Sequence, residues 1–345
     1  MPKRVLITGG TGFLGVYAAR KFLKEEFEVV LFDTAPLDAK DLKDKVTVIQ
    51  SDIRNKKAVI KACKNVDYIV HAAAALPIQR ARQKIYSVNI EGTRNVLNAA
   101  LANNVKKVIF ISSTAVYGVP KVLPETETSP LKPIGWYGKS KVAGEKLCKE
   151  YNDKGLATII LRPKTFLGPE RLGVFSLWFE AIYLGHRVFI LGNGKNKYQL
   201  LAVTDVVDAI YNAIMSNVKN EIFNIGAKDF QTWRKDLKFV IKTDKSRSKI
   251  TGLPVLPTQV ILQLLELLHL SPLAAWHYKT MPVDSYVSIT KAHELLNWTP
   301  KKSNQDLLLE SYLWYKKNRN KILDRKGKTH RVNWNFRLLN LVSKI

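Results

Sequence analysis

The sequence predicts an α/β fold, in which a doubly wound parallel sheet is followed by a smaller α/β domain. Apolar runs of three to five residues alternate with helical stretches through the first half of the chain, at residues 5–7, 29–32, 46–49, 67–70, 107–111 and 157–161. This alternation indicates parallel strands with helices on both faces of the sheet. A glycine-rich turn after the first run and an aspartate after the second complete the pattern.

Three glycines lie between the first apolar run and a helix that the apolar spacing predicts over residues 16–23. Gly9, Gly12 and Gly15 permit a tight bend, close approach of a pyrophosphate to the helix amides, and packing of helix on strand. Asp33 ends the second run about two dozen residues further on, where a carboxylate would accept hydrogen bonds from both ribose hydroxyls. Because it would repel a 2′-phosphate, the pattern favours NAD over NADP. An aspartate that merely ends a strand is the alternative.

The composition is that of an ordinary globular protein of 345 residues. Two cysteines without a partner motif and six scattered histidines predict neither a disulfide framework nor a metal site, and favour a reducing, cytoplasmic compartment. We expect no signal peptide before the first strand and no membrane span. The net charge of +26 is spread along the chain without a nucleic-acid-binding motif, so we interpret it as a lysine-rich surface and expect no specific nucleic-acid partner.

Polar and small residues follow the next strands, at the edge where open α/β sheets bind ligands. Asp52 and Ile53 follow the third strand, where an adenine ring would lie, although Asp52 could equally cap the helix that comes next. The alanines after His71 would let a cofactor pass close to the backbone, or would serve packing alone. Ser112 and Ser113 follow the fifth strand and are expected to face the same crevice.

Tyr137 and Lys141 are four residues apart at the start of a predicted helix, hence on one face of it. A tyrosine hydroxyl, with an ordinary pKa of about 10, is a poor base at neutral pH unless its phenolate is stabilised. Lys141 and the positive nicotinamide ring would supply that stabilisation, and Ser113 would hydrogen-bond the oxygen that changes between alcohol and ketone. Alone, the two residues would be an ordinary surface pair. Together with the glycine turn and the serines, they predict a base for hydride transfer.

Four motifs carry a family resemblance: Thr8-Gly-Gly-Thr-Gly-Phe-Leu-Gly15, Ser113-Thr-Ala-Val-Tyr-Gly118, Tyr137-Gly-Lys-Ser-Lys141, and Leu161-Arg-Pro163 with Gly168-Pro169. Together they resemble the extended short-chain dehydrogenase/reductase family, the group of NAD-dependent sugar epimerases and dehydratases, over roughly residues 3–315. The resemblance implies that Ser113, Tyr137 and Lys141 are catalytic. It also implies a Rossmann NAD-binding domain over 1–165, with 200–226 returning to it, a substrate domain over 166–199 and 227–315, and a tail over 316–345.

The resemblance further implies a set of cofactor-binding residues and a partner. The NAD-binding residues would be Gly9, Thr11, Gly12, Phe13, Leu14, Gly15, Asp33, Asp52, Ile53, His71, Ala72, Ala73, Asn89, Ser112, Tyr137, Lys141 and Pro163. Homodimers are frequent in the family, and here helices over 83–103 and 136–152 would pair into a four-helix bundle.

Departures from the family pattern narrow the reaction. Thr114 and Ala115 stand where dehydratases and decarboxylating members carry acidic residues, so elimination and decarboxylation are disfavoured. Tyr198 and Gln199 replace an arginine–aspartate pair whose arginine grips the diphosphate of nucleotide sugars, a charge that Lys195 or Lys197 could restore. The run at 192–196 is also similar to that of 3β-hydroxysteroid dehydrogenases, whose substrates are apolar. The candidate substrate residues are Thr114, Lys164, Thr165, Lys195 and Tyr198.

Two segments of the second half are strongly apolar or basic. Over residues 259–270 leucines surround a narrow polar stripe, so we expect a helix buried on the substrate domain, with a lid over a lipid-like substrate as the alternative. Over residues 316–331, eight Lys and Arg residues are opposed only by Asp324, and apolar residues then recur at helical spacing. Such a tail could lie on a membrane surface, or pack on its own domain or on a dimer mate.

These observations predict an NAD-dependent enzyme that removes hydride from a secondary alcohol. The leading interpretation is a nucleotide-sugar (UDP-hexose) 4-epimerase, in which the ketone turns over in the pocket and hydride returns to its other face. The alternative is a dehydrogenase of 3β-hydroxysteroids or hydroxy lipids, which releases NADH. A third class, a non-catalytic dinucleotide sensor, would have no need of Tyr137 and Lys141 together.

Overall fold

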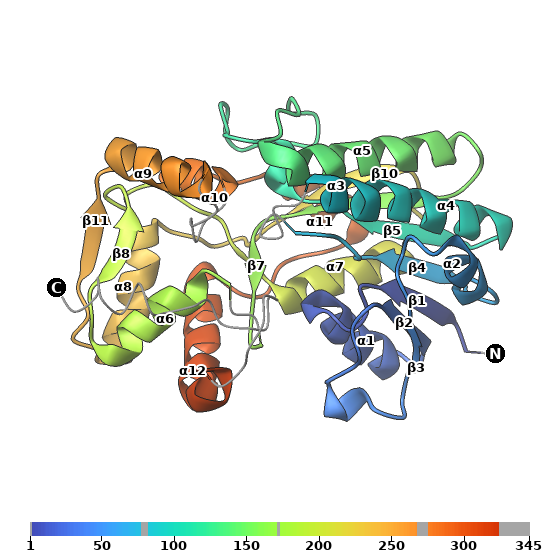
Figure 1. The fold of residues 1–345 in the computed structure, drawn as a ribbon, viewed down its shortest axis with the longest axis horizontal. Coiled ribbons are helices and arrows are strands. Elements are labelled where there is room, and N and C mark those ends of the chain that lie inside the picture. Colours follow the sequence, from blue (N-terminus) through green and yellow to red (C-terminus); the bar gives the residue numbers. More distant parts are fainter. Residues whose placement is uncertain (1, 77–81, 171–172, 268–274, 324–345) are drawn as a thin grey trace.

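A seven-stranded parallel sheet forms the centre of the computed structural model, which describes residues 2–76, 82–170, 173–267 and 275–323 (Figure 1). The strand order is β10-β6-β5-β4-β1-β2-β3. The strands are β1 (Arg4–Thr8), β2 (Glu28–Asp33), β3 (Thr47–Gln50), β4 (Tyr68–His71), β5 (Lys107–Ile111), β6 (Thr158–Pro163) and β10 (Glu221–Ile225). The predicted parallel sheet is therefore confirmed, and each predicted strand end lies within two residues of the observed one.

The connections of β1 leave a crevice at the carboxyl ends of the strands. The chain passes from β1 outward to β2 and β3, then returns to β4 on the other side of β1 and continues to β5 and β6. In doubly wound sheets, ligands bind outside the carboxyl ends of the strands at such a reversal. The glycine turn after β1 and the alanines after β4 thus meet at this point.

Helices cover both faces of the sheet. On one face pack α1 (Phe13–Lys24), α7 (Val203–Met215) and α11 (Thr290–Leu296), and on the other α2 (Lys56–Ala62), α4 (Gly92–Ala102) and α5 (Gly135–Asn152). A short helix α3 (Arg82–Tyr86) and a π-helical turn η3 (Ser87–Glu91) lead into α4. In β1, Val5 and Ile7 enter the first core and Leu6 the second, because successive side chains of a strand point to opposite faces.

A third core lies beside the sheet, at the left of Figure 1. It is built by α6 (Phe175–Leu184), α8 (Trp233–Thr243) and α12 (Asn304–Leu323), with β8 (Val188–Leu191) paired to β11 (Ile250–Leu253). A two-stranded ladder of β7 (Phe166–Leu167) and β9 (Leu201–Ala202) lies between this core and the sheet. The domain boundaries drawn from the sequence stay predictions.

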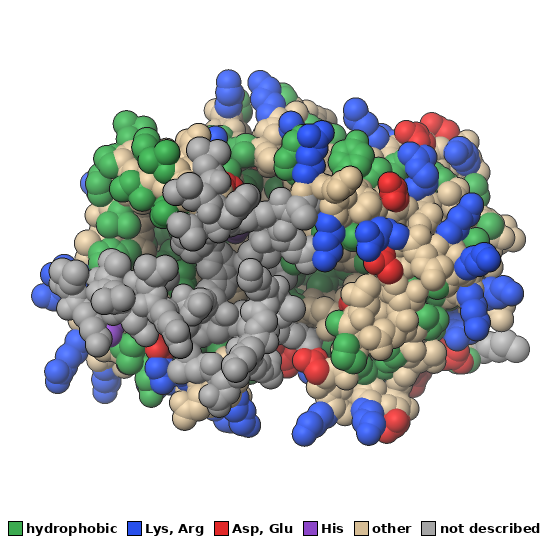
Figure 2. Space-filling view, viewed as in Figure 1, with side chains coloured by type: hydrophobic (Ala, Val, Ile, Leu, Met, Phe, Trp, Pro, Cys, Tyr) green, Lys and Arg blue, Asp and Glu red, His purple; other side chains and the backbone are tan. Residues whose placement is uncertain are grey.

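The leucine-rich segment forms α9 (Val255–Leu267), which is followed by α10 (Ala275–Thr280). The expectation that this helix is buried is wrong: Leu256 is 75% exposed, and Val260, Ile261 and Leu264 are each 56% exposed. Figure 2 shows hydrophobic side chains gathered over α9, at the upper left of the molecule. The predicted membrane-surface part of the tail falls on 324–345, outside the described residues. Among those that are described, no helix has the length and apolar character needed to cross a membrane.

Candidate active site

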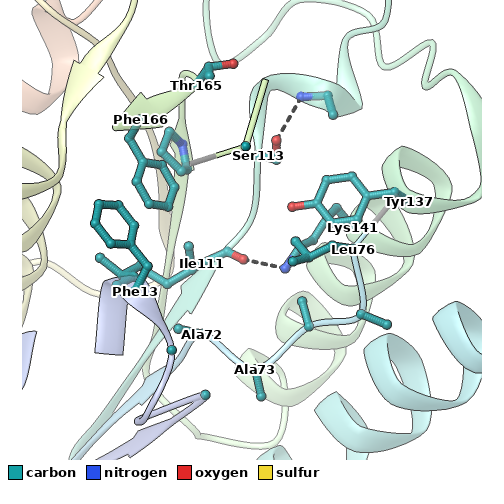
Figure 3. A pocket seen from close by; sticks show the side chains of 18 of the residues that line it. Phe13, Ala72, Ala73, Leu76, Ile111, Ser113, Tyr137, Lys141, Thr165 and Phe166 are labelled. Carbon is teal, nitrogen blue, oxygen red and sulfur yellow. Dashed lines mark hydrogen bonds between the residues drawn. The ribbon is translucent and has the colours of Figure 1, made fainter. Parts of the chain in front are cut away.

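A cavity of about 610 Å³ runs along the carboxyl ends of the strands, between the sheet and the third core (Figure 3). One half of its lining comes from the glycine turn and from the segments that follow β2, β3, β4 and β5. The other half comes from the segment after β6 and from α6, α8 and α10. The predicted crevice is therefore a real cavity, with a wall that belongs to the second half of the chain.

The glycine turn lies against the alanine segment at the floor of the cavity. Gly9 has φ +70°, and a Cβ there would lie 2.9 Å from the backbone nitrogen of Ala73, closer than real Cβ atoms come. Gly12 is the N-cap residue of α1 and contributes no side chain, so the first amides of that helix are accessible to an anion. Gly9, Gly12, Phe13 and Leu14 line the cavity, whereas Gly15 lies behind it, packed on the carbonyls of the turn.

Asp33, at the end of β2, presents its carboxylate to the same cavity. Its Oδ2 accepts a hydrogen bond from the amide of Thr11 (3.2 Å) and its Oδ1 from the amide of Ala35 (3.2 Å). These two backbone donors hold the carboxylate at the lip of the turn. Thr11 lies outside the lining, and its hydroxyl donates to the carbonyl of Ala35 (3.2 Å).

Asp52 and Ile53 also line the cavity, beside an arginine that the sequence analysis missed. Arg54 Nη2 lies 2.6 Å from Asp52 Oδ2, and this contact holds the pKa of Asp52 below its usual value. The side chain of Asn55, and not of Asp52, caps α2, because Asn55 Oδ1 accepts from the amide of Ala58 (3.2 Å). The alternative role of Asp52 as the helix cap is thus wrong.

The segment after β4 is held by two buried polar residues that do not line the cavity. His71 is wedged between the hydroxyls of Thr8 (2.7 Å from Nδ1) and Thr93 (2.9 Å from Nε2), and burial lowers its pKa to about 3. Asn89 accepts from the amide of Ala75 (2.7 Å) and donates to its carbonyl (3.1 Å). Asn89 also donates to Ser140 of α5 (2.9 Å), so it joins the alanine segment to the helix that carries Tyr137.

The three predicted catalytic side chains meet on one wall of the cavity (Figure 3). Lys141 and Tyr137 come from successive turns of α5, and Lys141 Nζ lies 5.7 Å from the centroid of the Tyr137 ring. Ser113 is the N-cap of the turn η4 (Thr114–Val116), and its hydroxyl accepts from the amide of Ala115 (3.1 Å). The Tyr137 hydroxyl and Ser113 face the same open space in Figure 3.

Lys141 is buried, with 4% of its surface exposed. Its Nζ donates to the carbonyl of Ile111 (2.7 Å) and lies 5.1 Å from the centroid of the Phe110 ring. Burial lowers the pKa of Lys141 to about 8, while the carboxylate of Glu145 opposes that shift. At neutral pH this lysine is therefore a cation in an environment that screens its charge poorly.

Ser112 lines the cavity, but its hydroxyl points to a buried ion pair. It donates to Glu145 Oε1 (2.5 Å), and the Glu145 carboxylate also pairs with Arg162 (2.6 Å). Arg162 belongs to β6 and Glu145 to α5, so this network fixes the catalytic helix to the sheet. Pro163, next along β6, lines the cavity as predicted.

The far wall of the cavity is aromatic. Tyr198 stacks on Trp233 (ring centroids 4.7 Å apart), and Trp178 packs edge-on against Trp233 (5.0 Å). The aromatic lining residues of this wall are Phe166, Phe175, Trp178, Tyr198, Trp233 and Trp276. Such a wall suits a flat or apolar ligand group.

One buried cation interrupts this aromatic wall. Lys164 is 2% exposed and lines the cavity, where its Nζ donates to the Ser285 hydroxyl (2.7 Å) and lies 4.9 Å from the Tyr198 ring centroid. Burial lowers the pKa of Lys164 to about 7 and raises that of the nearby Glu125 carboxyl to about 7. Lys164 can therefore offer a charge or a hydrogen bond to a ligand near neutral pH.

The other candidate substrate residues divide into two groups. Thr114 and Thr165 line the cavity, with Thr165 Oγ1 3.5 Å from the Tyr198 hydroxyl. Lys195 is exposed and lies outside the cavity lining. Gln199 is buried and serves the backbone, since it donates to the Ala227 carbonyl (2.7 Å) and accepts from the Val287 amide (2.9 Å).

Several lining residues escaped the sequence analysis. Besides the residues of the aromatic wall other than Tyr198, they include Arg54, Leu76, Lys84, Val88, Val174, His277 and Met281. Four of the aromatic residues come from α6, α8 and α10, which the sequence keeps far from the motifs. A high aromatic content after residue 165 was the one signal that could have drawn attention to them.

The residues present fit a dinucleotide: a turn that tolerates no Cβ at Gly9, accessible amides at the start of α1, and the carboxylate of Asp33 at the end of β2. The fold and this cavity define an NAD-dependent enzyme of the extended short-chain dehydrogenase/reductase class. Comparison with known proteins makes the assignment firmer. The model of the NAD dependent epimerase/dehydratase family matches residues 5–226. The chain belongs to this family, and NAD is its cofactor.

Three similar proteins describe the breadth of the family around this chain. An uncharacterised protein, y4nG of Sinorhizobium fredii, is 34% identical over 99% of this chain and 85% of its own. The structure of UDP-glucose 4-epimerase from Thermotoga maritima with UDP-glucose has a TM-score of 0.78 and is 25% identical, over 91% of this chain and 99% of that one. A 3beta-hydroxysteroid-dehydrogenase/decarboxylase of Arabidopsis thaliana is 34% identical over 59% of this chain and 39% of its own.

Proposed function

We propose that this protein oxidises a secondary alcohol to a ketone with NAD and then returns hydride to the other face of the same carbon, as a UDP-hexose 4-epimerase does. The observation that carries the proposal is the meeting of Tyr137, Lys141 and Ser113 on the wall of a cavity whose floor is the glycine turn. Bound NAD supplies the hydride acceptor.

Each of the three side chains has one part in the reaction. The buried ammonium of Lys141 stabilises negative charge on the neighbouring Tyr137 oxygen, since the field of a cation is strong in a poorly solvated site. Tyr137 takes the proton of the substrate hydroxyl as general base and returns it when the alcohol re-forms. The Ser113 hydroxyl hydrogen-bonds the same substrate oxygen and keeps its carbon against the nicotinamide.

The neighbouring residues limit the reaction to hydride removal and return. Thr114 and Ala115 place no carboxylate beside Ser113, so no side chain there can remove a carbon-bound proton for elimination. The Asp33 carboxylate lies where it would repel a 2′-phosphate, which favours NAD over NADP.

The substrate has two candidates. A nucleotide sugar agrees with the similarity to the Thermotoga maritima enzyme, and the aromatic wall could stack a uracil ring, while Lys164 contacts a polar substituent. A hydroxysteroid or hydroxy lipid agrees with the same aromatic wall and with Tyr198, which stacks on Trp233 at the place where the family's arginine would grip a diphosphate. We also propose a homodimer through α3, α4 and α5, which light scattering would test.

The Tyr137→Phe variant tests the proposed base. Turnover should fall by about 10²–10⁴-fold, because the hydroxyl that takes the proton is gone, whereas NAD affinity should stay within a few-fold of the parent. Tyr86→Phe is a matched control, since Tyr86 is 52% exposed and lies outside the cavity lining. Near-normal turnover of Tyr137→Phe would remove the proposed base.

Assays of the unmodified enzyme distinguish the two substrate candidates. With UDP-glucose or UDP-galactose, a 4-epimerase interconverts the two without added NAD and without net NADH. Stoichiometric NADH from a hydroxysteroid, with no epimer formed from the nucleotide sugars, would replace the leading candidate with the second one.

A further inference from the structure

The outer face of α9 is apolar along its length. Leu256, Val260 and Leu264 follow one another at intervals of four residues, and Ile261 lies next to them, so their side chains form one stripe. All four are more than half exposed. A surface helix of a water-soluble domain normally turns such a stripe toward the core.

Two polar residues of the same helix, Gln259 and Glu266, are bound to the neighbouring helix, whereas Gln263 is exposed. Gln259 Nε2 donates to the carbonyl of Tyr278 (2.9 Å), and Glu266 accepts from the Tyr278 hydroxyl (2.6 Å) and from the amide of Ala275 (3.3 Å). These bonds tie α9 to α10 and fix its rotation. The helix cannot roll its stripe toward the protein without breaking them.

Charge around this face distinguishes the possible partners. Glu266 is the one charged residue within α9, and it is engaged with Tyr278. Exposed cations lie along the β8–β11 ladder that leads into α9: Arg187 beside Thr251 of β11, then Arg247 and Lys249 just before that strand, and Lys279 lies on α10. Together with the net charge of +26, they favour an anionic partner and disfavour a second copy of this chain.

The shape of the surface favours a bilayer over a folded protein. A single peripheral helix with a convex apolar stripe (Figure 2) needs no complementary groove when it lies in the headgroup region of a membrane. The exposed cations of the β8–β11 ladder and Lys279 of α10 add electrostatic attraction to anionic headgroups. We propose that α9 docks the protein on anionic membranes by burying Leu256, Val260, Ile261 and Leu264 in the lipid interface.

Docking through α9 would place the cavity close to the membrane. The neighbouring helix α10 contributes Trp276 and His277 to the cavity lining and is bound to α9 through Tyr278. The proposal concerns where the protein resides, and it stands whichever of the two substrates is turned over.

The test measures binding of the full-length protein to phosphatidylcholine vesicles with and without phosphatidylglycerol. The parent should sediment with the anionic vesicles, and added salt should weaken the binding. Val260→Gln with Leu264→Gln should lower the partition coefficient about tenfold or more, because two apolar side chains no longer enter the interface. NAD affinity and circular dichroism should be unchanged, since both positions are exposed.

A matched control uses two exposed leucines on other helices. Leu295 of α11 is 47% exposed and Leu313 of α12 is 49% exposed, and the double change to Gln there should leave vesicle binding unchanged. The proposal is overturned if the parent does not bind anionic vesicles, or if both double variants bind them as strongly as the parent. It is equally overturned if the α9 change converts a dimer into a monomer without vesicles, because the stripe then faces a second copy.

Discussion

Replacing Lys141 by Met tests the electrostatic part of the proposed mechanism, with little change in side-chain volume. A unit charge 5.7 Å from the centre of the Tyr137 ring stabilises negative charge there by about 3 kcal/mol, at an effective dielectric constant of about 20. Loss of that stabilisation should lower kcat/KM about 100-fold. The fold should tolerate the change, because a buried ammonium is exchanged for an apolar side chain.

The pH profile gives this prediction a second readout. Since burial lowers the pKa of Lys141 to about 8, its charge is present at neutral pH and is lost as the pH rises through about 8. The kcat/KM of the parent should therefore fall as the pH rises through that range. The kcat/KM of Lys141→Met should not show this fall.

The assay follows product formation over pH 6 to 10 in the parent, Lys141→Met and Lys139→Met. Lys139 is exposed on the same helix and is the matched control, for which the profile should match that of the parent. NAD affinity is measured separately by titration, so that loss of cofactor is not mistaken for loss of catalysis. Turnover of Lys141→Met within threefold of the parent, with NAD bound, would refute the electrostatic reasoning.

Three further predictions concern cofactor choice, substrate binding and acid stability. Asp33→Asn should weaken NAD binding about tenfold and narrow the preference for NAD over NADP, whereas an unchanged ratio of the two dissociation constants would contradict the proposed contact between Asp33 and the ribose hydroxyls. Lys164→Met should raise the substrate KM about tenfold with NAD affinity intact, and Lys195→Met, outside the cavity, should not; equal effects would argue against a contact between Lys164 and substrate. Burial lowers the pKa of His71 to about 3. As the pH falls below about 6.5, the imidazole is therefore protonated in the unfolded chain but stays neutral in the folded protein. Between pH 7 and pH 5 the free energy of unfolding, measured in urea, should fall by about 2 kcal/mol more for the parent than for His71→Gln. Equal falls in the two proteins would mean that His71 is not kept neutral in the fold.

The sheet and the cofactor half of the cavity could be predicted because their determinants are local. Strands buried on both faces are apolar along most of their length, as in residues 108–111, and the turn after β1 needs glycine for reasons confined to a few residues. Tyr137 and Lys141 belong to one helix, so their spacing alone placed them together.

Most of the aromatic wall could not be predicted, because it is assembled from distant segments. Trp178 and Trp233 reach the cavity through the packing of α6 and α8 in the third core, and Trp276 reaches it from α10, which leaves no spacing to read. Lys195 was a candidate substrate residue because it lies three residues before Tyr198. It follows left-handed turns at Gly192 (φ +80°) and Gly194 (φ +69°), and its side chain lies at the surface. For α9, periodicity reveals an apolar side and a polar side, but not which of them faces the solvent.

The aromatic wall makes the protein its own optical probe. Three of the six tryptophans among the described residues line the cavity, and two of them, Trp178 and Trp233, touch each other edge-on beside Tyr198. Any molecule that enters this half of the cavity must change the surroundings of those indoles. Ultraviolet emission of the unlabelled protein should therefore report ligand entry directly, and a screen for the natural substrate can begin before any reaction product has been identified.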